Sequence, residues 1–179
     1  MDLALHWILR LGLALIFGAS ALAKLGNVGE FRLSLRAYGV LPPVLEGVAV
    51  FLVPVLELVA VGLLLGSKVA WGALLLLALL FIFSGAILIG LRRGGRFNCG
   101  CIGGWVNEPL TSSLLLRNAV LALLASSLLR SPSIRTLEAL DRATILFGGV
   151  LLFLFYLGVS VLLANSFRIK NLGLGGSRG

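Results

Sequence analysis

The sequence has little charge, a single histidine and only two cysteines. Charged residues make up 12 % of the chain, whereas 59 % of it is hydrophobic and the mean hydropathy is +1.10. Soluble globular domains carry about 25 % charged residues, so this composition excludes a soluble domain and is typical of an integral membrane protein. A chain of 179 residues is long enough for one bundle of membrane-spanning helices and leaves no room for a separate soluble domain.

The scarcity of histidine and cysteine restricts metal binding. His6 is the single histidine, and Cys99 and Cys101 are the two cysteines. Two thiolates suit Cu(I) or zinc, but a structural zinc site needs four ligands. His6 is expected at the opposite membrane face, a bilayer core of about 30 Å away from the cysteines. These residues alone do not complete a tetrahedral site, so no metal is expected.

Acidic residues are few, and the chain is strongly basic as a result. It contains 15 lysines and arginines against 7 acidic residues, a formal net charge of +8. The arginines are scattered at the ends of apolar segments and are not gathered on one face, as a nucleic-acid surface would require. Basic flanks of this kind face anionic lipid head groups. The sequence therefore predicts contact with membrane lipid and no nucleic-acid partner.

Long apolar runs predict five membrane-spanning helices, each close to the roughly 20 residues that a span needs. The fourth run is short and contains Arg117 and Asn118. Only Ser67 and Lys68 separate the second run from the third, so these two helices are expected to form an antiparallel hairpin. The predicted fold class is an all-α membrane bundle over residues 1–166 followed by a disordered tail at 167–179, with spans at about residues 3–23, 44–66, 69–91, 112–129 and 143–165.

The first run also resembles the apolar core of a signal peptide, because small residues and a lysine follow it. A signal peptide begins with a basic region, whereas no positive side chain precedes Arg10. We therefore expect the first helix to be retained. With five spans, the two ends of the chain lie on opposite faces, and the loop that follows the first span shares a face with the cysteines.

The loop at residues 26–43 contains an amphipathic pattern. Val28, Phe31, Leu35 and Tyr38 fall at helical spacing, and the pattern ends at a glycine and two prolines. This favours a helix lying in the membrane interface, and the alternative is an ordinary structured loop. By the parity of the spans, this segment is expected to lie near the cysteines.

Cys99 and Cys101 are separated by one glycine within the stretch RRGGRFNCGCIGGW. A disulfide between them would close a very small ring, which stabilises little and is strained enough to be easily reduced. Arg92, Arg93 and Arg96 precede the pair, and nearby cations lower the pKa of a thiol. The pattern favours an exchanging thiol pair, while unreactive loop cysteines and a metal site remain as alternatives.

Several charged residues fall within the predicted spans. Arg10 and Glu57 are expected at similar depth, and a charge at membrane depth is costly unless it is paired, so we predict an Arg10–Glu57 ion pair. The alternative is that each side chain reaches the interface separately. A second group near the opposite face could form a polar cup beneath the cysteine loop, as structural support or as part of the chemistry; it consists of Lys24, Glu46, Arg117 and Asn118.

The chain contains, in order, the stretches LRLGLALIFGASALAKLG, LRAYGVLPP, PVLELVAVGLLLG, RRGGRFNCGCIGG and LLLRNAVLAL. Together they resemble the MauE branch of the DoxX-like membrane proteins, over about Arg10 to Leu129. The block Cys-Gly-Cys-Ile-Gly followed by Arg-Asn is the most specific part, although Ile102 stands where that family usually has phenylalanine. The resemblance implies a four-helix DoxX-like core, with the predicted fifth span beyond it. It also places five polar residues at family motif positions: Arg10, Lys24, Glu57, Arg117 and Asn118.

The resemblance further implies a thiol–disulfide redox role in methylamine utilisation, namely maturation of the small subunit of methylamine dehydrogenase. Cys99 and Cys101 would be the exchanging catalytic pair of a thiol–disulfide oxidoreductase, with a thioredoxin-like protein and a secreted disulfide-containing substrate as partners. The alternative is a non-catalytic membrane anchor or chaperone for the thioredoxin-like partner. No cofactor is evident; a lipid quinone is a candidate electron acceptor that no residue pattern demonstrates.

The orientation in the membrane is predicted by two opposing arguments. The face that carries the cysteines holds more lysine and arginine than the amino-terminal face, which favours a cytoplasmic location. Disulfides persist outside the cytoplasm, which favours the opposite orientation. We follow the chemistry and expect a multi-pass protein of the inner (plasma) membrane with an extracytoplasmic cysteine loop.

Overall fold

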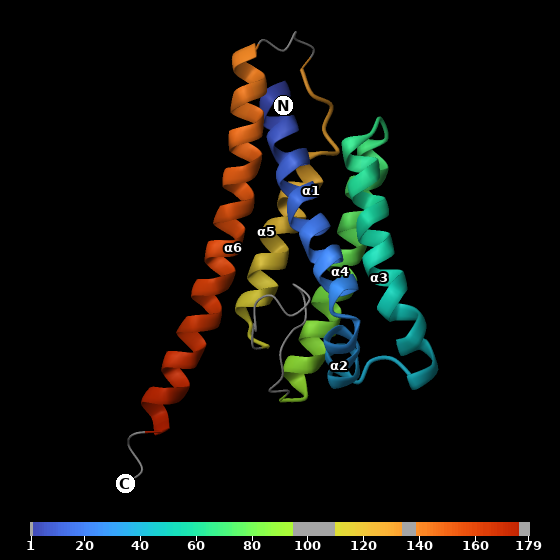
Figure 1. Cartoon of the computed structure of the whole chain (residues 1–179), viewed down its shortest axis with the longest axis vertical. Coiled ribbons are helices and arrows are strands. Elements are labelled where there is room, and N and C mark those ends of the chain that lie inside the picture. The colour runs from blue at the N-terminus through green and yellow to red at the C-terminus, as the bar shows by residue number, and fades with distance from the viewer. Residues whose placement is uncertain (1, 95–109, 134–138, 176–179) are drawn as a thin grey trace.

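The computed structural model describes residues 2–94, 110–133 and 139–175, with side chains described up to residue 165 apart from 43 and 139. These residues are all-helical and contain no strand, and four of the helices are long and apolar enough to cross a membrane. The predicted all-α membrane bundle is therefore confirmed (Figure 1). The helices are α1 (Leu3–Gly26), α2 (Val28–Tyr38), α3 (Pro43–Leu65), α4 (Val69–Arg92), α5 (Ser113–Ser127) and α6 (Ala139–Gly175).

Helix α1 is the centre of the bundle and contacts α2, α3, α5 and α6. The Asp2 carboxylate accepts a hydrogen bond from Ala4 N at 2.8 Å, which caps the start of the helix. Within its most apolar 18 residues α1 is 61 % buried, against 11 % for α6. Its inward face joins the main hydrophobic core through residues such as Leu13 and Phe17.

Helices α3 and α4 form the predicted antiparallel hairpin. Gly66 N donates to Gly62 O at 2.9 Å and ends α3, and α4 begins only three residues later. A Cβ atom at Gly72 would lie 2.8 Å from Leu64 N, so the two helices approach each other through this glycine. The short connection and the close packing together hold α3 and α4 as one unit.

Helix α2 confirms the amphipathic interpretation of residues 26–43 and excludes the loop alternative. Phe31 and Tyr38 are buried on one side of it. Gly39 ends the helix with φ of 60°, the left-handed conformation that favours glycine. Arg93 Nη1 donates to Tyr38 O at 3.2 Å and to Gly39 O at 2.9 Å, so the end of α4 satisfies the last carbonyls of α2.

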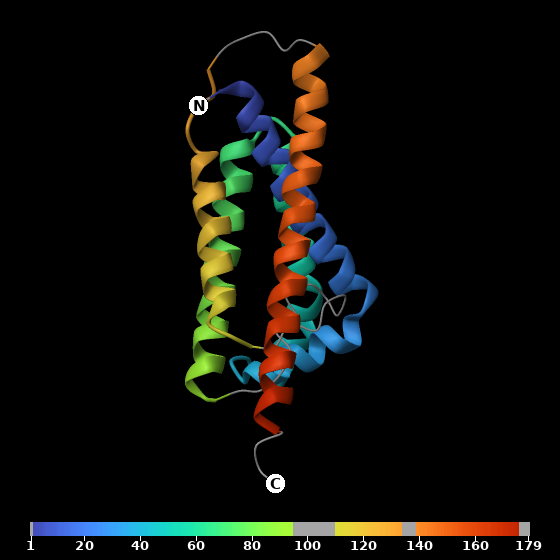
Figure 2. The same cartoon turned by 90° about the vertical axis from the view of Figure 1, so that its left-hand side faces the viewer.

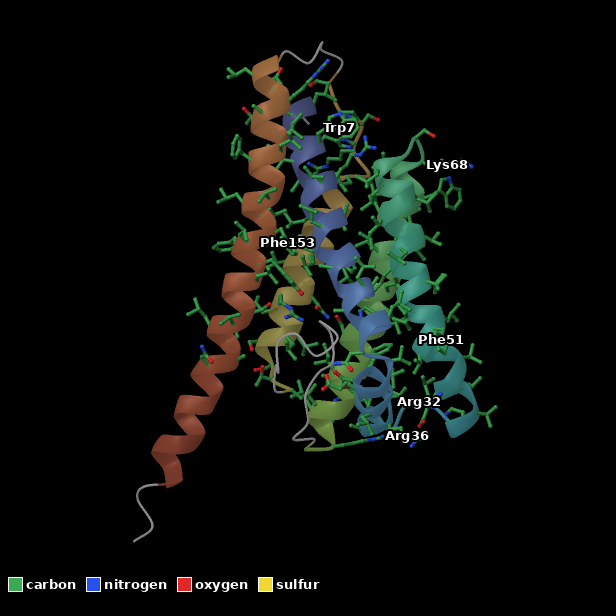
Figure 3. All side chains as sticks on the ribbon, in the orientation of Figure 1. Trp7, Arg32, Arg36, Phe51, Lys68 and Phe153 are labelled. Carbon is green, nitrogen blue, oxygen red and sulfur yellow. The ribbon has the colours of Figure 1, made fainter. Side chains whose placement is uncertain are left out.

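The start of α1 and the end of α6 lie at opposite ends of the bundle (Figures 1 and 2). We call these the N-terminal end and the α2 end. Trp7 and Lys68 lie toward the N-terminal end, and Arg32 and Arg36 lie at the α2 end (Figure 3). Four of the five predicted spans, α1, α3, α4 and α6, are long and apolar enough to cross a membrane, whereas α5 is a shorter apolar helix.

Helix α5 has 15 residues and is about 22 Å long, less than a bilayer core of about 30 Å. After it, the chain reaches the N-terminal end, where α6 begins (Figure 1). Helix α6 packs against α1 and leans away from the bundle toward the C-terminus. It continues to Gly175 and so includes most of the segment for which we expected disorder. Extending an existing helix fixes one residue for each new hydrogen bond, which costs far less than starting one.

Candidate functional site

The interior of the bundle contains an ion pair between α1 and α3. Lys24 Nζ lies 2.5 Å from Glu57 Oε1 and donates a second hydrogen bond to Ser20 Oγ at 2.8 Å. Only 2 % of the Lys24 side chain and none of the Glu57 side chain is exposed. The rings of Phe31 and Phe83 lie 5.6 and 5.1 Å from the ammonium, within the range of cation–π attraction.

The direction of the helices explains why these two residues meet. A side chain on a helix tilts toward the N-terminus of that helix. Lys24 lies near the C-terminal end of α1 and therefore points into the bundle. Glu57 lies on the antiparallel α3 and points toward the α2 end, so the two side chains tilt toward each other.

The predicted Arg10–Glu57 ion pair is wrong. Arg10 Nε donates to Leu64 O and Nη2 donates to Gly66 O, both at 2.8 Å, so its guanidinium binds the C-terminal carbonyls of α3. The guanidinium also stacks 3.8 Å above the ring of Trp7. Arg10 tilts toward the N-terminal end while Glu57 tilts away from it, and Leu64 is about 10 Å farther along α3 than Glu57. Similar depth of the backbone positions did not bring the side chains together.

Helices α4, α5 and α6 add further polar groups near this ion pair. Arg117 Nη1 donates to Ser160 Oγ at 3.2 Å, and the Arg117 guanidinium lies 5.3 Å from the Tyr156 ring. Asn118 Nδ2 donates to Ser84 Oγ at 3.3 Å. Arg117 and Asn118 are themselves buried. We call the whole group the polar cluster; it consists of Ser20, Lys24, Glu57, Ser84, Arg117, Asn118, Tyr156 and Ser160.

A cavity of about 20 Å³ connects members of the polar cluster from different helices. Ser20, Glu57, Arg117, Asn118 and Tyr156 are among the residues that line it. Glu57 Oε2 is buried and has no hydrogen-bond partner among the described residues. A volume of this size can hold one water molecule, and a buried polar atom of this kind is the usual partner of such a water.

The predicted polar cup at the α2 end is only partly correct. Lys24, Arg117 and Asn118 do come together, but Glu46 lies apart from them at the start of α3. Arg36 Nε donates to Glu46 Oε2 at 2.6 Å, so this carboxylate holds α2 against α3 instead. Within the polar cluster Lys24 and Arg117 are positive and Glu57 is negative, which leaves an excess of positive charge.

Four residues of the polar cluster have hydroxyl side chains, and none of them was predicted from the sequence: Ser20, Ser84, Tyr156 and Ser160. Hydroxyl side chains are frequent in membrane helices, so their presence alone indicates nothing. Ser20 lies four residues before Lys24 on the same helical face, a spacing that could have identified it. For Ser84 and Ser160 the sequence contains no comparable signal, because their partners lie on other helices.

The predicted exchanging pair, Cys99 and Cys101, lies outside the described residues. The segment that contains it connects α4 to α5. The flanking ends of α4 and α5 both lie at the α2 end (Figure 1). Leu110, which follows the segment, packs with Tyr38 of α2 and with Leu114 of α5. Among the described residues, no three histidine, cysteine or acidic side chains gather as a metal site would require.

Comparison with known proteins identifies the family. Residues 3–131 match the family described as "Methylamine utilisation protein MauE". Proteins named "Methylamine utilization protein MauE" are 37 % identical over 159 residues in Paracoccus denitrificans and 37 % identical over 163 residues in Paracoccus versutus. These alignments cover 87 % and 88 % of this chain, and 86 % and 87 % of the two relatives.

A third protein of the same name, from Methylorubrum extorquens, is 34 % identical over 121 residues, which cover 66 % of this chain and 65 % of the relative. No solved structure matches the chain. The described residues form the all-α multi-pass membrane bundle that the resemblance implied. The family match spans α1 to α5 and more than two thirds of the sequence, so the chain is a member of the MauE family.

Proposed function

We propose that this chain is a membrane thiol–disulfide redox protein that supports disulfide formation in a partner protein. The observation that carries the proposal is the Cys-Gly-Cys sequence at Cys99 and Cys101, between α4 and α5. A disulfide in so small a ring exchanges readily, and the arginines before it favour the thiolate form of the cysteines. The protein is then a thiol–disulfide oxidoreductase.

The surroundings of the segment support this role. Arg93 is fixed by its hydrogen bonds to α2, directly before the segment, and Leu110 is packed directly after it. The two ends of the connection are thus held on a rigid base. A rigid base holds a reactive loop at a defined place for a partner protein.

The names of the relatives indicate a pathway. Three relatives are named for methylamine utilisation, and we propose that this chain acts in the same process. Its substrate would be the disulfide-rich small subunit of methylamine dehydrogenase, with a thioredoxin-like protein as redox partner. Such a role requires the inner (plasma) membrane and an extracytoplasmic cysteine segment, because structural disulfides form outside the cytoplasm.

The test replaces each cysteine separately and together. In cells that express the partner substrate, Cys99→Ser and Cys101→Ser should each abolish its disulfide maturation while the membrane level of this chain stays normal. One of the two variants should accumulate a mixed disulfide with the partner, detectable on non-reducing gels. We expect Cys101 to be the attacking thiol, because it lies nearer in sequence to α5 and Arg117.

Full maturation of the substrate in the double Cys99→Ser/Cys101→Ser variant would contradict the proposal. It would favour the second role, a non-catalytic membrane anchor or chaperone for the thioredoxin-like partner. A matched control is Ser126→Ala, because Ser126 is exposed, its Oγ donates to the Leu123 carbonyl of its own helix, and it is not a member of the polar cluster. That variant should mature the substrate normally.

A further inference from the structure

Two arginines of α2 lie against the first turns of α3. Arg36 Nε donates to Glu46 Oε2 at 2.6 Å, and a Cβ atom at Gly47 would lie 3.8 Å from Arg32 Nη2. Arg32 and Arg36 are four residues apart, so they share one face of α2 and their Cβ atoms are about 6 Å apart. Both guanidinium groups therefore reach the start of α3.

This pair of arginines has more positive charge than its surroundings neutralise. Glu46 pairs with Arg36, but 58 % of the Arg36 side chain remains exposed. Arg32 is exposed and forms no ion pair with any residue that the structure describes. Glu30 is about 200° around α2 from Arg32, so it lies on another side of the helix. Positive charge and N–H donors are thus available to an anion at this place.

An exposed apolar stripe on α3 begins beside the two arginines. It consists of Phe51, Val55 and Val59, which follow Gly47 at intervals of four residues and so run along one side of the helix. These three side chains are 53, 47 and 46 % exposed. Figure 3 shows Phe51 farther from the α2 end than the arginines. From Gly47 to Val59 the stripe rises about 18 Å, which exceeds half of a bilayer core of about 30 Å and so suits one acyl chain.

The depth of the arginines matches the phosphate layer of a membrane. The apolar span of α3 begins at Val44, and Gly47 lies only about 4.5 Å farther along the helix. The head-group layer outside the hydrocarbon is about 5–7 Å thick, a distance that an arginine side chain can bridge. A guanidinium binds phosphate oxygens through paired N–H donors. A zwitterionic lipid head also contains a cation that arginines repel, so an anionic head is preferred.

The combination of charge and apolar surface separates the candidate occupants. An acidic segment of a partner protein would satisfy the arginines but would make no use of the apolar stripe. We propose that this face binds an anionic phospholipid, with its phosphate at Arg32 and Arg36 and one acyl chain along the apolar stripe. Such a lipid would hold α2 against α3 at the membrane interface. The inference goes beyond the proposed function, because it does not involve the cysteines.

The test uses the full chain in phosphatidylcholine nanodiscs that contain a phosphatidylglycerol probe with a photoreactive diazirine in one acyl chain. We expect the probe to label α3 between Gly47 and Val59, and excess unlabelled phosphatidylglycerol should remove the labelling. A phosphatidylcholine probe with the same chain should label these residues about fivefold less, because its head is neutral overall. Mass spectrometry of the peptides locates the labels.

Three variants measure the contribution of the charge. Arg32→Gln should raise the fraction of phosphatidylglycerol needed for half-maximal labelling about fivefold, the factor expected for one arginine near an anionic head. Arg32→Lys should have a smaller effect, because lysine keeps the charge. Arg32 is exposed, so neither change disturbs the core. The matched control is Lys68→Gln, since Lys68 is an exposed cation toward the opposite end of the bundle. This control should be labelled like the unchanged chain.

Equal labelling of α3 by the two probes would overturn the proposal, because any lipid would then cover this face. Equal effects of Arg32→Gln and Lys68→Gln would also overturn it, because the net charge of the whole chain would then attract the probe. Removal of the labelling by glycerol phosphate, which has no acyl chain, would contradict the part assigned to the apolar stripe.

Two other occupants have outcomes of their own. Binding of polyglutamate that is lost in Arg32→Gln, with α3 unlabelled by the lipid probe, would assign the face to an acidic protein segment. Two chains in each nanodisc, with α3 again unlabelled, would assign it to a second copy of this chain. Either result would overturn the lipid proposal. Neither would change the proposed redox function, which is tested separately by the cysteine variants.

Discussion

Lys24 and Glu57 approach each other from antiparallel helices, each tilted along its own helix toward the other, and their charged atoms meet 2.5 Å apart. Both side chains are enclosed by the bundle, so neither can reach water if the other is removed. Membrane helices gain little from hydrophobic attraction to one another, so polar contacts between them carry more weight. Because a charge inside the membrane is costly unless it is paired, the ion pair fixes how far one helix can slide along the other. This pair sets the position of α3 relative to α1.

Breaking this pair on one side is expected to destabilise the bundle strongly. Lys24→Met leaves the Glu57 carboxylate buried without a cation, and the expected loss is about 3–5 kcal/mol. The double variant Lys24→Met/Glu57→Leu should lose less than the sum of the single changes. Thermal unfolding in detergent measures all three variants.

The control for that cycle is the ion pair between Arg36 and Glu46. The Arg36 side chain is 58 % exposed, so Arg36→Met should cost no more than about 1 kcal/mol. Equal losses for Lys24→Met and Arg36→Met would show that the buried pair has no special contribution. Strict additivity of the Lys24 and Glu57 changes would contradict their contact.

Arg10 is expected to act independently of Glu57. Arg10→Met removes two hydrogen bonds from a charged donor to the carbonyls of Leu64 and Gly66, each worth about 1.5–3 kcal/mol. Because the two side chains do not meet, the loss in the Arg10→Met/Glu57→Gln variant should equal the sum of the single losses to within about 0.5 kcal/mol. A coupling energy above about 1 kcal/mol in unfolding experiments would contradict the separation that we describe.

The packing of α6 on α1 should depend on one glycine and not on another. A Cβ atom at Gly149 would lie 2.7 Å from Leu11 Cδ2 and 3.0 Å from Leu11 Cβ, whereas one at Gly158 would meet nothing within 4 Å. Gly149→Ala should therefore cost about 1–3 kcal/mol by overpacking, and Gly158→Ala should not destabilise the protein. Thermal unfolding and the rate of proteolysis within α6 measure the difference. Similar behaviour of the two variants would contradict the close approach of α6 to α1.

The orientation of the bundle can be measured with single cysteines. A membrane-impermeant maleimide should label Cys99 or Cys101 from outside intact, reduced cells, as the proposed function requires. Lys68 lies toward the opposite end of the bundle (Figure 3) and is exposed. In a chain with both native cysteines changed to serine, Lys68→Cys should react only after the membrane is opened. The reverse pattern would show that the excess of basic residues near the cysteines had indicated the orientation correctly.

The composition of the sequence and the periodicity of its apolar residues were sufficient to predict the helical architecture. The apolar runs predicted the helices, the two residues between α3 and α4 predicted the hairpin, and the spacing of Phe31 and Tyr38 predicted α2. These features depend on local sequence, because each helix satisfies its own backbone and exposes a face that lipid or core can cover.

The interior of the site was predicted less well, for physical reasons. Similar depth along their helices predicts that Arg10 pairs with Glu57, but the tilt of each side chain toward the N-terminus of its own helix determines the partner. Ser84 and Ser160 contribute through contacts with α5, and their spacing along the chain does not reveal such contacts.

The order of the polar cluster along the chain has a consequence for biosynthesis in the membrane. Lys24 is made 33 residues before Glu57, so the cation is already present when the acidic helix leaves the ribosome. Arg117 is made 43 residues before Ser160, so α5 is synthesised with its arginine before that partner is made. In a nascent chain halted before α6 is made, Arg117 of α5 would lack its contact with Ser160. Completion of α6 is therefore the step at which Arg117 gains its contact with Ser160.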